Sequence, residues 1–176
     1  MVIGPVPTLA NVPRSRVRGF DLDLSWRPSP LVTLSGSLNH SDSRIKSHLL
    51  LPNFANVVED VHGRQFSYAP RWSGTGDVQV DIPINPDLTG FVGGAGLYNS
   101  STNAQLTGGR PPRIKSYATL DLRAGIKAAN ARWQTSLWGR NVTNAYYWTN
   151  VNTVGDAVTR MTGRPATYGV RVDWSF

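Results

Sequence analysis

The chain has 176 residues, which is enough for one domain with a sizeable core. It contains no cysteine, which excludes disulfides, thiolate metal sites and cysteine nucleophiles. Its net charge of +7 comes from scattered arginines without a lysine-rich run, so nucleic acid is not favoured as a partner, and no stretch approaches the ~18 apolar residues of a membrane-spanning helix.

Seven strands follow one another along the chain. Residues 1–15 are rich in proline and asparagine and predict a loop or the remnant of a preceding strand. Apolar and polar residues then alternate with period 2, which predicts strands with one apolar and one polar face. The predicted strands are 17–27, 31–41, 71–84, 88–98, 116–127, 132–141 and 167–176.

The first predicted strand shows the pattern clearly, because Phe20, Leu22 and Leu24 alternate with Asp21 and Asp23. In the fourth strand, one face carries a mixture of large and small residues: Phe91, Gly93, Ala95 and Leu97. No segment shows a sustained helical period. The sequence therefore predicts an all-β protein.

The connections alternate between short and long. Short turns are predicted at 28–30, 85–87 and 128–131, and long loops at 43–69, 99–114 and 142–164. This order is typical of outer-membrane barrels, which have short periplasmic turns and long extracellular loops. We therefore predict about seven strands of an antiparallel up-and-down transmembrane β-barrel.

The last strand ends the chain on an aromatic residue. It looks like the closing strand of a bacterial outer-membrane barrel, which carries a signal for the assembly machinery. The residues assigned to this signal are Gly169, Val170, Val172, Trp174 and Phe176. Aromatic girdles are predicted at both membrane interfaces, with Trp26, Trp133, Trp174 and Phe176 at the periplasmic level and Trp72 and Tyr168 at the extracellular level.

Three motifs carry a family resemblance: Ser136-Leu137-Trp138-Gly139-Arg140-Asn141-Val142-Thr143-Asn144-Ala145-Tyr146-Tyr147, Tyr68-Ala69-Pro70-Arg71-Trp72 and Gly163-Arg164-Pro165-Ala166-Thr167-Tyr168-Gly169. Residues 16–176 resemble the C-terminal barrel portion of TonB-dependent outer-membrane receptors. The resemblance implies a receptor in the outer membrane of a Gram-negative bacterium that takes up a siderophore, cobalamin or a saccharide. It implies no enzyme activity and no cofactor.

The family barrel has roughly 22 strands around a plug, and neither a plug domain nor a secretory signal peptide is recognisable here. We therefore expect a fragment that does not transport alone. Its expected partners are outer-membrane lipid, lipopolysaccharide and the barrel assembly machinery. The energy-coupling inner-membrane complex would act only through the missing N-terminal plug region.

Two alternatives remain open at this stage. A soluble carbohydrate-binding β-sandwich would place polar partners around its tryptophans, and a small autonomous barrel would need an eighth strand from residues 1–15. The excess positive charge at the predicted extracellular rim suggests contacts with lipopolysaccharide or an anionic ligand by Arg110, Arg113 and Lys115. The three histidines, His40, His48 and His62, are interpreted as solvated loop residues, and Tyr146-Tyr147-Trp148 as a girdle or loop-packing cluster.

Overall fold

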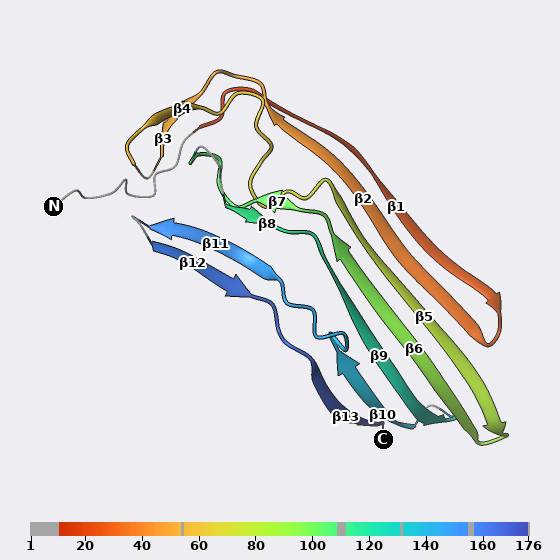
Figure 1. Cartoon of the computed structure of the whole chain (residues 1–176). Helices are drawn as coiled ribbons and strands as arrows, with labels where there is room; N and C mark the ends of the chain where they lie inside the picture. The colour runs from red at the N-terminus through yellow and green to blue at the C-terminus, as the bar shows by residue number, and fades with distance from the viewer. Residues whose placement is uncertain (1–10, 54, 109–111, 131, 155–156, 176) are drawn as a thin grey trace.

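The protein forms a single curved wall of long strands with smaller hairpins at one end (Figure 1). The computed structural model describes residues 11–53, 55–108, 112–130, 132–154 and 157–175. Seven strands make the wall, in the order β1-β2-β5-β6-β9-β10-β13, with every neighbouring pair antiparallel. Their bounds are β1 Ser15–Ser29, β2 Val32–Ile45, β5 Trp72–Asn85, β6 Leu88–Asn99, β9 Tyr117–Ala128, β10 Trp133–Arg140 and β13 Thr167–Trp174.

All seven predicted strands are confirmed, each within a few residues of its predicted bounds. The strands form because alternating apolar residues are brought to one side of the sheet, and register is fixed when one face is apolar throughout. Leu22 pairs with Leu38, and Val80 pairs with both Val32 and Val92. The predicted fold class is therefore correct for strand number, direction and up-and-down order.

The three long connections are more ordered than the sequence suggested. They contain the two-stranded ladders β3 (Leu50–Pro52) with β4 (Val58–Asp60), β7 (Thr102–Asn103) with β8 (Arg113–Ile114), and β11 (Trp148–Val154) with β12 (Ala157–Thr162). The long connections lie at their predicted positions, but the sequence did not reveal the ladders within them. Most of these strands are too short to show a period, and contacts between different loops support them.

The buried apolar residues lie mostly in these connections and not on the outward side of the wall. Ile45 and Val61 are fully buried near β3–β4, while Ala104, Ile114 and Val151 form a second cluster between β7–β8 and β11. The Tyr68 hydroxyl donates to the Val151 carbonyl at 3.2 Å and ties the first long connection to the third. The end of the molecule that carries the hairpins is thus stabilised by its own small hydrophobic cores.

None of the described residues forms a helix long and apolar enough to cross a membrane.

Candidate functional site

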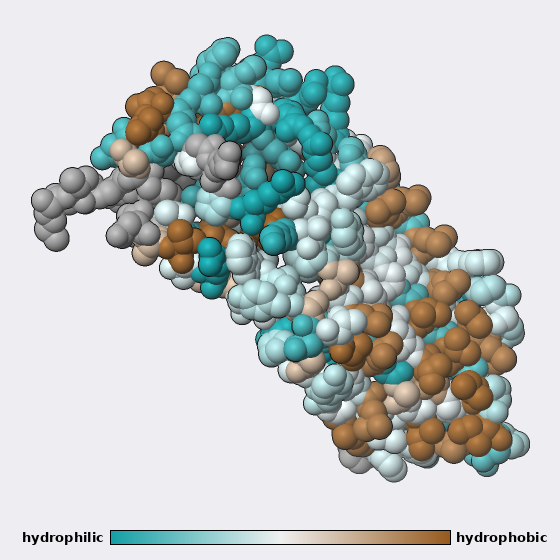
Figure 2. Space-filling model, viewed as in Figure 1, coloured by the Kyte–Doolittle hydropathy of each residue, from teal (hydrophilic) through white to brown (hydrophobic). Residues whose placement is uncertain are grey.

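The outward face of the wall is apolar and uncovered. Its most exposed aliphatic residues are Leu22, Leu137, Val170 and Val172, with exposed fractions between 58% and 69%. Figure 2 shows apolar residues gathered over the long strands and polar ones over the hairpin end. A water-soluble sandwich would bury this face under a second sheet, and the described residues form only two-stranded ladders besides the wall. The sandwich alternative is therefore wrong.

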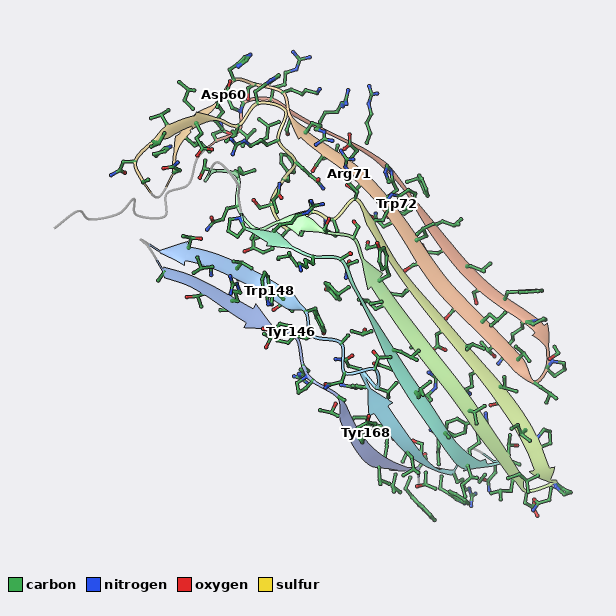
Figure 3. The ribbon with its side chains drawn as sticks, in the orientation of Figure 1. Asp60, Arg71, Trp72, Tyr146, Trp148 and Tyr168 are labelled. Carbon is green, nitrogen blue, oxygen red and sulfur yellow. The ribbon has the colours of Figure 1, made fainter. Side chains whose placement is uncertain are left out.

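The predicted girdle residues that the structure describes all lie on this outward face. Trp133 is directly opposite Trp174 across β10 and β13, and Trp26 is 56% exposed near the turn that ends β1. At the other ends of their strands, Trp72 and Tyr168 are 40% and 68% exposed (Figure 3). Phe176 lies outside the described residues. The girdle assignment itself stays a prediction.

His40 is not the solvated loop residue that the sequence suggested. It lies in β2 on the outward face, directly opposite Phe20 on one side and Trp72 on the other. Its ring centroid is 4.4 Å from that of Trp72 and 5.7 Å from that of Phe20. His40 falls within the predicted strand 31–41, and the period-2 alternation with Leu38 places it on the outward face, within an aromatic row.

Glycine and aromatic residues alternate across the last two strands. Trp138 lies opposite Gly169, and Gly139 lies opposite Tyr168. A Cβ atom on Gly169 would come within 2.5 Å of the Trp138 ring, and one on Gly139 within 2.8 Å of the Tyr168 ring. The predicted assembly-signal residue Gly169 therefore has a packing role as well, because it leaves room for the indole on the inner face.

The inner face carries a network of charged side chains that crosses three strands. Arg123 of β9 donates to both carboxylate oxygens of Asp77 on β5, at 2.7 and 2.8 Å, and also to Gln79 at 3.1 and 3.2 Å. The guanidinium group crosses β6 above Gly93, where an added Cβ would lie 2.8 Å from Arg123 Cζ. Gly93 thus leaves room for the guanidinium group in this position, a role that the sequence did not reveal.

A second ion pair continues the network, because Lys127 Nζ donates to Asp81 at 2.7 Å. The face of the fourth predicted strand that carries Phe91 is the inner face. Phe91 is 4% exposed, and the Lys127 ammonium group lies 6.0 Å from its ring centroid. The inner face is therefore polar, and Asp77 and Asp81 on it form ion pairs with Arg123 and Lys127, which is the opposite character to the outer face.

Asn141 organises the connection between β10 and β11. Its backbone N–H donates to Asp121 at 2.8 Å, and its side-chain amide donates to the carbonyls of Ala145 and Arg164 at 3.0 and 2.9 Å. It is 4% exposed and has a φ of 47°, a left-handed conformation that asparagine tolerates better than most residues. Asn144, with φ 49°, holds the Ala166 N–H at 3.0 Å. The motif beginning at Asn141 thus joins the two ends of the third long connection.

A cavity of about 390 Å³ opens beside this motif at the upper end of the inner face. Its polar and charged lining comes from β9, β10, β13 and both ends of the β11–β12 hairpin. The lining includes Asp121, Arg140, Tyr147, Thr149, Arg164 and Thr167. Two guanidinium groups and one carboxylate, which already accepts the Asn141 N–H, leave the cavity with an excess of positive charge.

The predicted aromatic cluster at 146–148 is mainly engaged in loop packing. Tyr147 stacks on Tyr117 with ring centroids 4.2 Å apart, and Trp148 packs against the core of Ala104, Ile114 and Val151. The Arg160 guanidinium lies 4.5 Å from the Trp148 ring centroid. Tyr146 remains 77% exposed (Figure 3).

His48 and His62, in the first long connection, both contact the carboxylate of Asp60. His48 Nδ1 lies 2.5 Å from Asp60, the His62 backbone N–H donates to the same carboxylate at 2.9 Å, and the two imidazole rings stack. The hydrogen bond with His48 is the main cause that lowers the pKa of Asp60 below its ordinary value of 3.8. Among the described residues, no three histidine or acidic side chains gather to hold a metal ion.

The residues proposed as anion contacts at 110–115 are not brought together as a group. Arg113 Nη2 donates to the Ser101 hydroxyl at 2.5 Å, Lys115 is exposed, and Arg110 lies outside the described residues. Their role stays a prediction.

A seven-stranded wall with an apolar outer face, a polar inner face and ordered connections at one end is typical of a large outer-membrane barrel. The family model for TonB-dependent receptor-like β-barrels matches residues 2–142. The chain belongs to this family. No curated protein matches it.

Solved structures of TonB-dependent receptors share the fold. The siderophore receptor PiuA from Acinetobacter baumannii is 19% identical, with a TM-score of 0.70 over 90% of this chain and 21% of its own. The ferric yersiniabactin uptake receptor FyuA from Yersinia pestis is 21% identical, with a TM-score of 0.72 over 90% of this chain and 23% of its own. BauA, the ferric preacinetobactin receptor of A. baumannii, is 17% identical, with a TM-score of 0.70 over 92% and 22%. The chain spans about a fifth of each receptor's length.

Proposed function

We propose that residues 16–176 form part of the barrel wall of an energy-coupled uptake receptor in the outer membrane of a Gram-negative bacterium. The observation that carries this proposal is the combination of an uncovered apolar outer face with a polar inner face, on which Arg123 and Lys127 of β9 pair with Asp77 and Asp81 of β5. Lipid would cover the outer face, and water or other parts of the receptor would meet the inner one. A single such wall does not enclose a pore, so transport is a property of the complete receptor.

The ligand class that fits best is an anionic iron chelate. The structurally similar receptors named above take up ferric siderophores. In this chain, Arg140 and Arg164 supply positive charge to the cavity beside Asn141. Guanidinium groups bind carboxylate and phenolate oxygens through charge-assisted hydrogen bonds. Coupling to the inner-membrane energy source would require a plug region outside the stretch that this chain matches.

The membrane assignment can be tested by vesicle insertion of a receptor that contains this chain, because the edges of β1 and β13 need neighbouring strands in lipid. Insertion should protect the strands of the wall from protease. It should also move tryptophan emission to shorter wavelength, because Trp26, Trp72 and Trp174 enter an apolar environment. A folded, monodisperse receptor that ignores vesicles and keeps water-exposed tryptophans would refute the assignment.

The ligand assignment needs a receptor that contains this chain. The double variant R140Q/R164Q should lower ferric-siderophore affinity by about a hundredfold, since it removes two charge-assisted hydrogen bonds that each contribute about 1.5 kcal/mol. The matched control R27Q/R132Q removes the same charge at the opposite ends of the strands and should leave affinity unchanged. Equal effects of the two variants would contradict the role of the cavity.

A further inference from the structure

Four arginines gather on the outer face where β1, β2 and β5 leave the predicted membrane band. We call them the upper arginine cluster: Arg16, Arg18, Arg44 and Arg71. The strand register places Arg16 opposite Arg44 and Arg18 opposite Asp42, on the same face as Phe20 and His40. Arg71 immediately precedes Trp72, which lies opposite His40 (Figure 3). The sequence separates these residues by up to 55 positions, so only the sheet brings them together.

One carboxylate lies within this cluster and does not neutralise it. Asp42 Oδ1 is 3.0 Å from Arg44 Nη2 and 3.2 Å from Arg71 Nη2. Both contacts are ion pairs without hydrogen-bond geometry, and Asp42 Oδ1 accepts no hydrogen bond within the described part of the chain. Four guanidinium groups and one carboxylate leave a net charge of +3, with N–H donors still available.

The surface below the cluster is ordered by depth. Directly beneath the cations comes the aromatic row of Phe20, His40 and Trp72, with ring centroids between 4.4 and 5.9 Å apart. Beneath the row, Leu22 and Leu24 are 58% and 57% exposed. A membrane lipid presents the complementary order, with a headgroup, an interface and acyl chains at matching levels.

The cations are local to this part of the wall. At the corresponding ends of β6, β9 and β13 the outward residues are Tyr98, Ala118 and Tyr168. A uniform rim of solvated charge would spread over every strand. The concentration on three neighbouring strands instead favours one bound headgroup.

We propose that the upper arginine cluster binds the phosphate groups of a phosphorylated glycolipid in the outer leaflet. Guanidinium groups pair with phosphate oxygens in a forked geometry that carries both charge and direction. The aromatic row would lie at the level of the sugar, and the leucines would contact the acyl chains. This proposal rests on the proposed outer-membrane location. The sequence suggested a lipopolysaccharide contact at Arg110, Arg113 and Lys115, and the proposal places that contact on the upper arginine cluster instead.

The test compares lipid A carrying both phosphates with its phosphate-free form, each in micelles containing the complete chain. The variant R18Q/R71Q should bind the phosphorylated lipid at least about tenfold more weakly, because hydrogen bonds between ionised groups are the strong ones. Its binding of the phosphate-free lipid should not change. The control R27Q/R132Q removes two exposed arginines at the periplasmic ends and should behave like the wild type.

A second variant separates this role from damage to the fold. D42N removes the carboxylate that competes with phosphate for Arg44 and Arg71, so it should bind the phosphorylated lipid more tightly. A variant that merely disturbed the sheet would not gain affinity. Circular dichroism of every variant checks that the strands are present.

Three results would overturn the proposal: equal affinity of the wild type for both lipids, equal losses in R18Q/R71Q and the control, or weaker binding by D42N. Displacement by inorganic phosphate at the same concentration as the lipid phosphate would assign a general anion site and not a lipid site. A chain that stays folded outside the micelles would instead refute the proposed membrane function. A chain that enters them without distinguishing the lipids would refute the glycolipid site alone.

Discussion

Replacing Leu122 with arginine tests which face of the wall meets lipid. Leu122 is the middle outward residue of β9, 48% exposed, and its cross-strand neighbours Gly94 and Gly139 have no side chain to cover it. It lies five positions after Tyr117 at the start of the strand, which is about 12 Å along the membrane normal at ~3.4 Å per residue and ~45° tilt. An arginine side chain does not span that distance, so the charge would stay in the hydrocarbon. We expect a loss of about 2–4 kcal/mol in the free energy of unfolding.

Leu97 provides the matched control. It is also a leucine and is 37% exposed, but it lies on the inner face opposite Thr75 and Thr119. L97R places the guanidinium in a wet space that Asp77 and Asp121 also line, so we expect a loss below about 1 kcal/mol. Urea titrations of a vesicle-inserted receptor containing this chain measure both values. Similar losses in L122R and L97R would show that the assignment of the two faces is wrong.

Three further changes test other parts of the structure. G93V should force Arg123 away from Asp77 and lower the free energy of unfolding by about 1–2 kcal/mol in the same titration, and an unchanged value would show that the crossing contact is dispensable. Deleting Phe176 in a complete receptor should reduce heat-modifiable barrel in the outer membrane, and normal amounts would contradict its role as an assembly signal. The lowered pKa of Asp60 means that its carboxylate stabilises β3–β4 above pH 3.8 and loses this effect as the pH falls through the lower folded-state value. The protection of the hairpin amides from hydrogen exchange, relative to the intrinsic exchange rate at each pH, should therefore fall only in acid.

Sequence reasoning succeeded where one local pattern decided the outcome. Alternation between Phe20 and Trp26 defines a strand and both of its faces, and the short turns at 28–30 and 85–87 fix the antiparallel pairs β1–β2 and β5–β6. It failed where several segments support one another. The hairpin β11–β12 is stabilised by the packing of Val151 against Ala104 and Ile114, which are distant in sequence.

The sequence by itself determined the strands, their order and the family, because period-2 alternation and connection length are properties of single segments. Only the tertiary structure decided which side chains act together. Arg123 reaches Asp77 because the register places Gly93, which has no side chain, between them. Asn141 joins the two ends of the third long connection through a hydrogen bond to Arg164, 23 positions away. The upper arginine cluster exists for the same reason. A sheet brings side chains together across strands only a few ångströms apart, whatever their distance along the chain.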